Sequence, residues 1–123
     1  MVRRGENRLT ISSDILRGYT DTIILAQLMG KDSYGYEINK NVQQRTDGKH
    51  EFKEATLYTA FKRLSQNGLI TSYWGEEGAG ARRRYYKITE EGKKQWEERS
   101  QEWQETRRLL DALLAVEVDY ESN

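Results

Sequence analysis

The chain has 123 residues, of which 36% are hydrophobic and 33% are charged, so it favours one compact domain with an appended element and leaves little room for a large enzyme core. It contains no cysteine and one histidine, which excludes disulfides, thiolate metal sites and cysteine nucleophiles and leaves little for acid–base chemistry near neutral pH. No run approaches the roughly 20 apolar residues that cross a bilayer, and the first residues lack the apolar core of a secretory signal. We therefore expect a cytoplasmic protein with no membrane partner.

Basic and acidic residues are unevenly distributed along the chain. The formal net charge is +0, from 20 lysines and arginines against 20 aspartates and glutamates. Residues 1–89, however, hold 15 basic and 10 acidic side chains, whereas residues 90–123 hold 5 and 10. This segregation predicts a basic working module joined to an acidic helical appendage.

Residues 1–12 are polar and basic without a sustained period, and we expect them to form a mobile arm. From Ser13 the pattern becomes helical. Ser13 and Asp14 are candidate N-caps, and a broad apolar stripe continues until Gly30. The sequence therefore predicts a first helix that begins near Ser13 and stops at Gly30.

The next two helices are expected to be short and amphipathic. Ser33 is a candidate N-cap for the second, which ends near Asp47–Gly48. The third follows a helical spacing with hydroxyl and cationic residues on its other face, and Asn67–Gly68 is its stop signal. Its expected core residues are Leu57, Ala60, Phe61 and Leu64.

A β-hairpin and a long helix follow. Leu69–Trp74 and Arg83–Ile88 are rich in β-branched and aromatic residues and predict two strands, whose connection contains Gly75, Gly78 and Gly80 and ends in an arginine run. Thr89 is the candidate N-cap of a helix that extends to about Val116. Apolar residues recur every seven positions along this helix, at Trp96, Trp103 and Leu110, and two more, Leu113 and Leu114, follow near its end. This pattern favours dimerisation through these five residues.

Three helices followed by a hairpin are typical of a winged helix-turn-helix, in which the third helix enters the DNA major groove. The expected fold is mainly α with a small β-hairpin. It comprises a DNA-binding domain (residues 13–89), a long C-terminal dimerisation helix (90–117) and a frayed tail (118–123). Hydroxyl and cationic donors suit contacts with phosphates and base edges. The candidate DNA-binding residues are Tyr34, Tyr36, Lys53, Ala55, Thr56, Tyr58, Thr59, Lys62, Arg63, Arg82, Arg83 and Arg84.

Several motifs, in order over roughly residues 15–92, resemble the PadR family of bacterial transcriptional regulators. They are Tyr34-Gly35-Tyr36-Glu37-Ile38, the run Ala55–Leu64, Gly68-Leu69-Ile70, Tyr73-Trp74-Gly75, the run Arg82–Tyr86 and Ile88-Thr89-Glu90-Glu91-Gly92. The resemblance implies a homodimeric winged-helix repressor with the C-terminal helix as its dimerisation arm. The single C-terminal helix is similar to the short subfamily. We expect a palindromic double-stranded DNA operator with half-sites about one helical turn apart.

The resemblance also suggests a ligand. Some short members hold planar, often cationic, compounds against a tryptophan of the C-terminal helix, and Trp103 falls at that position. The residues around it are more polar than a drug pocket prefers; these are Glu98, Arg99, Ser100 and Arg107. A planar small-molecule inducer at Trp103 is therefore one interpretation, and packing of Trp96 and Trp103 between two protomers is the other.

Two other classes of protein compete with this interpretation. A protein-interaction module would use the acidic C-terminal helix without specific DNA binding, and it predicts neither a steep salt dependence nor a preferred palindrome. An enzyme is disfavoured because the sequence has no nucleophile–base pair with histidine or cysteine and no phosphate-binding glycine spacing. We expect no cofactor and no metal.

Overall fold

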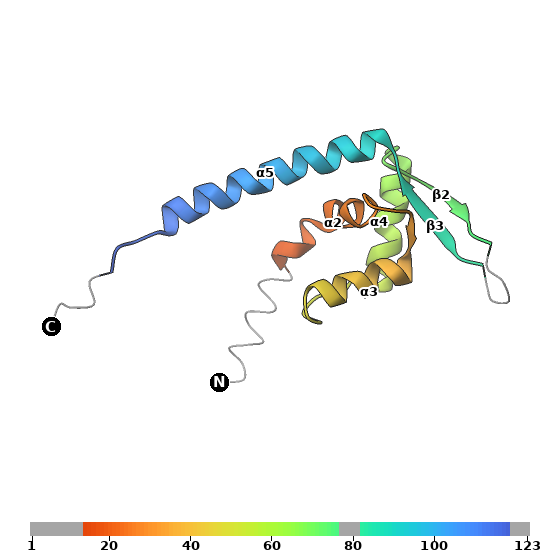
Figure 1. Cartoon of the computed structure of the whole chain (residues 1–123), viewed down its shortest axis with the longest axis horizontal. Helices are drawn as coiled ribbons and strands as arrows, with labels where there is room; N and C mark the ends of the chain where they lie inside the picture. Colours follow the sequence, from red (N-terminus) through yellow and green to blue (C-terminus); the bar gives the residue numbers. More distant parts are fainter. Residues whose placement is uncertain (1–13, 77–81, 119–123) are drawn as a thin grey trace.

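The computed structural model describes residues 14–76 and 82–118 (Figure 1). The predicted arm (1–12), the N-cap candidate Ser13, the tip glycines Gly78 and Gly80 and the end of the tail (119–123) lie outside the described residues. Residues 14–17 are helical and precede the other elements. In chain order these are α2 (Thr20–Gln27), β1 (Ser33–Tyr34), α3 (Gly35–Arg45), α4 (Glu54–Gln66), β2 (Ile70–Trp74), β3 (Arg84–Ile88) and α5 (Glu90–Leu114).

The predicted winged-helix architecture is confirmed. Helices α2, α3 and α4 enclose a core that the sheet covers on one side, and α5 packs on α2 before it extends past the rest of the molecule (Figure 1). The buried cluster contains the expected residues of α4 together with residues of α2, α3 and the sheet. Phe61 of α4 stacks on Tyr86 of β3 with ring centroids 3.9 Å apart, and this contact holds α4 against the β2–β3 hairpin, here called the wing.

The first helix is interrupted, whereas we expected one helix from Ser13 to Gly30. Residues 14–17 close with short-range bonds from Gly18 N to Ile15 O (3.1 Å) and from Tyr19 N to Leu16 O (2.9 Å), and α2 then runs only from Thr20 to Gln27. The hydroxyl of Thr20 donates to Arg17 O at 2.9 Å. Glycine is unfavourable inside a helix, and these local bonds satisfy the backbone at the break.

Ser33 was expected to cap the second helix, and this expectation is wrong. Tyr34 is the N-cap of α3, and Ser33 is buried in β1, where its hydroxyl donates to Glu37 Oε1 at 2.5 Å. That hydrogen bond holds the pKa of the Glu37 carboxyl below its ordinary value. The helix ends at Arg45, close to the expected turn, where Asp47 and Gly48 have positive φ values of 53° and 77°.

The sheet has one strand more than the predicted hairpin. Its order is β1-β3-β2, all antiparallel, with Ser33 opposite Tyr86 and Trp74 opposite Arg84. Two residues are too few to show a period in the sequence, so β1 was missed. Alternation along β3 places Tyr86 in the core and Tyr85 on the other face, where its ring stacks on Tyr73.

Thr89 is the N-cap of α5, as predicted, and its hydroxyl accepts from Gly92 N at 3.0 Å. The helix ends at Leu114, two residues before the expected Val116. Gly92 is buried against Leu69, in the connection between α4 and β2, and a Cβ there would overlap Leu69 O. This close backbone approach fixes where α5 leaves the winged-helix domain.

Candidate nucleic-acid interface

The exposed side of α4 forms a ridge whose residues recur at helical spacing. Ala55, Thr59, Lys62 and Gln66 are all exposed and lie opposite the buried residues of the same helix. Lys53 is exposed immediately before the helix begins. Thr56 and Arg63 lie on the flank that faces α2, whereas Tyr58 lies on the flank that faces the wing.

A hollow of about 680 Å³, here called the wing groove, separates α4 from the wing. Four cationic side chains line it, and its described lining includes no carboxylate. Tyr34, Tyr36 and Tyr58 contribute hydroxyl groups to the same surface. Its cations are Lys62, Arg82, Arg83 and Arg84. Guanidinium, ammonium and phenol groups are the donors that bind phosphate oxygens, so this groove has the chemistry of a phosphodiester contact.

The three wing arginines contact two different aromatic side chains. The guanidinium carbons of Arg82 and Arg84 lie 5.3 and 5.5 Å from the ring centroid of Trp74. Arg83 lies 4.8 Å from the ring of Tyr34, near the start of α3. Arg83 precedes β3, and its aromatic contact differs from that of its two neighbours. Sequence reasoning did not select Trp74, although its position opposite Arg84 follows from the hairpin register.

Two tyrosines of the predicted site differ in their surroundings. Tyr36 is 71% exposed at the beginning of α3. Tyr58 is 48% exposed, but its ring packs edge-on against Phe61, 5.6 Å between centroids, and its hydroxyl approaches Gly35. Tyr58 therefore has a packing role inside the protomer and keeps enough exposed surface for a contact with phosphate.

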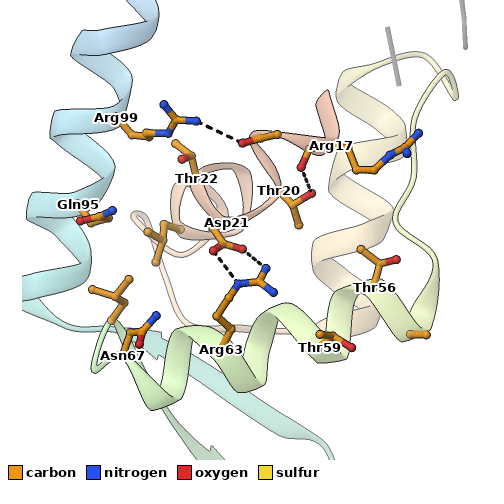
Figure 2. Close-up of a pocket in the computed structure, with 14 residues that line it drawn as sticks. Arg17, Thr20, Asp21, Thr22, Thr56, Thr59, Arg63, Asn67, Gln95 and Arg99 are labelled. Carbon is orange, nitrogen blue, oxygen red and sulfur yellow. Dashed lines mark hydrogen bonds and ion pairs between the residues drawn. The ribbon is translucent and has the colours of Figure 1, made fainter. Parts of the chain in front are cut away.

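Arg63 is bound within the protomer. Its Nε donates to Asp21 Oδ2 at 3.0 Å, and its Nη2 forms an ion pair with Oδ1 of the same carboxylate. The hydrogen bonds to Asp21 raise the pKa of the guanidinium above its ordinary value. Figure 2 shows this pair in a cleft of about 690 Å³ between α2, α4 and α5. The pair connects α4 to α2. The Asp21 carboxylate also offsets the positive charge of Arg63, which we expected to bind DNA.

We expect Asp21→Asn to increase the affinity for duplex DNA without regard to base sequence, because it frees the Arg63 guanidinium. The slope of log affinity against log salt should steepen by up to about 0.9 for each phosphate that Arg63 then contacts. Fluorescence anisotropy with a labelled duplex at several salt concentrations measures this slope. Asp21→Asn in an Arg63→Gln background is the control, and an equal rise there would show that Arg63 is not the group released.

The apolar residues of α5 divide into two groups. Trp96 is half-buried and packs against the core of its own protomer. Trp103 is 41% exposed and lies edge-on to Tyr19, with centroids 5.7 Å apart. Further along, the helix leaves the domain, and large apolar side chains are exposed there: Leu109, Leu110, Leu113 and Leu114.

Trp96 and Trp103 both line a largely apolar cavity of about 320 Å³ between α5 and residues 15–26. Of the four polar residues that sequence reasoning placed near Trp103, Arg99 and Ser100 line this cavity. The Arg99 guanidinium lies 4.7 Å from the Tyr19 ring centroid and donates to Gly18 O at 3.3 Å. A volume of about 320 Å³ lies at the lower end of the range for small-molecule pockets.

Neither a cluster of metal-ligating side chains nor a helix capable of spanning a membrane is found among residues 14–76 and 82–118. An exposed amphipathic helix beside a cationic β-hairpin defines the class of winged-helix DNA-binding proteins. Similarity to known proteins identifies the family. The model of the PadR-like family of transcriptional regulators matches residues 24–98, and the chain belongs to this family of DNA-binding regulators.

Solved structures and a curated relative are similar over most of the chain. A transcriptional regulator from Clostridium thermocellum is 50% identical, with a TM-score of 0.76 over 84% of this chain and 97% of its own. A PadR family regulator from Clostridium difficile R20291 is 40% identical, with a TM-score of 0.71 over 79% and 99%. An uncharacterized protein from Lysinibacillus sphaericus is 41% identical over 85% of this chain and 95% of its own.

Proposed function

We propose that the protein is a sequence-specific transcriptional repressor that acts as a homodimer on a palindromic operator. The observation that carries the proposal is the direct adjacency of the α4 ridge and the wing groove. Lys62 belongs to both, so one side chain connects the base-reading helix with the cationic wall. A partner that offers a groove about 12 Å wide beside a flanking phosphate strand, as B-DNA does, matches this arrangement.

In the proposed complex, α4 enters the major groove, and its ridge residues Thr59, Lys62 and Gln66 approach the base edges. The wing arginines and the tyrosine hydroxyls bind the phosphates of the strand that passes between α4 and the wing. Trp74 contacts the guanidinium groups of both Arg82 and Arg84, and these contacts restrict the conformations of the two side chains. In this proposal the protein acts in the cytoplasm, where it binds a promoter and thereby represses transcription from it.

The homodimer is supported by the exposed apolar residues of α5, which a second copy of the helix would cover. Leu113 and Leu114 are 76% and 74% exposed. Exposure of such large apolar side chains to water is unfavourable, so their burial against a second helix would stabilise a dimer. Two α5 helices packed together would fix the distance between two α4 helices and so the half-site spacing. A planar inducer beside Trp103 would release DNA if it binds better to a dimer with a different spacing.

The test is a selection of bound sequences from a random duplex pool at two salt concentrations. We expect a palindrome whose half-site centres lie about one helical turn apart, with enrichment maintained at the higher salt. Recovery of a single half-site would contradict the homodimer, and absence of any enrichment would favour the protein-interaction module. Thr59→Ala should then relax the base preference at one position and leave the salt slope unchanged.

A further inference from the structure

Cationic and hydroxyl side chains also border α4 on the side turned away from the wing. Arg17 ends the helical segment 14–17, and Lys53 immediately precedes α4. Both line a second hollow of about 380 Å³, here called the α2-side hollow, whose other lining residues are Thr20, His50, Glu51, Phe52 and Thr56. Arg17 and Thr56 also line the cleft of Figure 2, which shares no residue with the wing groove. Two separate polar surfaces therefore flank the α4 ridge.

The interruption of the first helix positions Arg17. The bond from the Thr20 hydroxyl to Arg17 O holds the backbone at the break, and Thr20 itself is buried. The guanidinium is bound to Asp14 Oδ1 at 2.6 Å, with exposed side-chain fractions of 68% for Arg17 and 61% for Asp14. An ion pair so exposed contributes little to stability, so a phosphate can replace this carboxylate at small cost.

Carboxylates also lie near this surface. Asp21 is paired with Arg63, and Asp14 is paired with Arg17. Glu51 lines the α2-side hollow and accepts a hydrogen bond from Gln43 Nε2, a neutral amide that leaves the negative charge of Glu51 in place. Arg17 and Lys53 set two positive charges against this one carboxylate, so the lining becomes net positive once a phosphate replaces Asp14 as the partner of Arg17.

A helix in the major groove lies between two phosphate strands, so a protein that reads bases with α4 has a strand on each side of it. We propose that Arg17 and Lys53 bind phosphates of the strand opposite the one bound in the wing groove. This inference rests on the proposed DNA-binding function and adds to it a second backbone contact from the N-terminal segment. Thr56 lines the same hollow, and in this arrangement its hydroxyl donates to the same strand.

The chain offers a closely matched control for Arg17. Arg108 of α5 is likewise an exposed arginine, paired with a carboxylate three residues earlier, Glu105, at 2.7 Å. We would measure the affinity of the full chain for its selected duplex against salt concentration for Arg17→Ala, Arg17→Lys and Arg108→Ala, with a thermal unfolding scan of each. Asp14→Asn and Glu105→Gln form the corresponding pair of carboxylate variants.

Arg17→Ala should reduce the salt slope by about 0.9 for each phosphate that the side chain no longer neutralises, and it should weaken binding by roughly tenfold. Arg17→Lys should retain the slope because it keeps the charge, and Asp14→Asn should strengthen binding. Arg108→Ala and Glu105→Gln should match the unaltered protein. Equal effects of Arg17→Ala and Arg108→Ala, or no effect of Arg17→Ala, would overturn the inference. Failure of the unaltered protein to bind any duplex would instead overturn the proposed function.

Discussion

Replacing Arg82 and Arg83 together by alanine is expected to weaken DNA binding by more than about 100-fold at moderate salt, since charge-assisted hydrogen bonds contribute roughly 1.5–3 kcal/mol each. Both side chains line the wing groove. Arg82 contacts Trp74, and Arg83 contacts Tyr34, so a different aromatic ring positions each guanidinium group. The loss should affect all duplex sequences alike because phosphates carry no base information.

The measurement is a titration of duplex DNA at a series of salt concentrations, in which the slope should fall by about 0.9 for each phosphate that the variant no longer neutralises. Lys93→Ala with Lys94→Ala is the matched control. It removes the same charge from α5, where each lysine is paired with a glutamate three residues earlier. If the control pair reduced the affinity as much as the wing pair, the effect would reflect net charge, and the wing groove would not be the site.

Phe61→Ala should lower the free energy of unfolding by about 3–5 kcal/mol, the usual cost of removing a large aromatic side chain from a core. Phe61 is 2% exposed and stacks on Tyr86, so the change opens a cavity between α4 and β3. Since a domain of this size has roughly 5–15 kcal/mol of stability in total, the variant should be close to unfolding. Urea denaturation followed by circular dichroism gives the value.

Phe61→Leu is the comparison for this variant. It fills most of the volume and removes the aromatic stack, so its expected cost is below about 1.5–2 kcal/mol. The stack also sets the separation between the base-reading helix and the wing, so Phe61→Leu should reduce operator affinity more than its lower stability explains. A Phe61→Ala variant that is destabilised by less than about 1 kcal/mol would show that this contact does not hold the two elements together.

Local sequence patterns were sufficient for the main elements of the fold. The spacing of Leu57, Ala60, Phe61 and Leu64 predicted α4 and its buried face, and all four are buried. Thr89 was identified as the cap of α5 from its residue type and the acidic turn after it. These features depend on interactions within about four residues, which a sequence displays directly.

The candidate site was predicted only as a set of residue types on particular elements. The wing arginines and Lys62 were selected from charge and position, and the structure brings them to one groove. It does not bring Arg63 to that groove, because Arg63 lies on the flank of α4 that faces α2, where Asp21 binds its guanidinium. Partners that are distant in sequence, such as Asp21 for Arg63 and Trp74 for Arg82, leave no periodic signal.

The sequence by itself determined the helical and strand segments, the basic and acidic halves and the resemblance to PadR-like regulators, because each is written in local spacing or in motif order. Tertiary structure alone decided which cations line the wing groove, where the first helix breaks and how deeply each tryptophan of α5 is buried. Trp96 packs against the core, whereas Trp103, one heptad later, is partly exposed. The physical reason is that the contact of α5 with the domain decreases along the helix and ends beyond Trp103, and no local pattern records where a helix ceases to be packed against the rest of the fold.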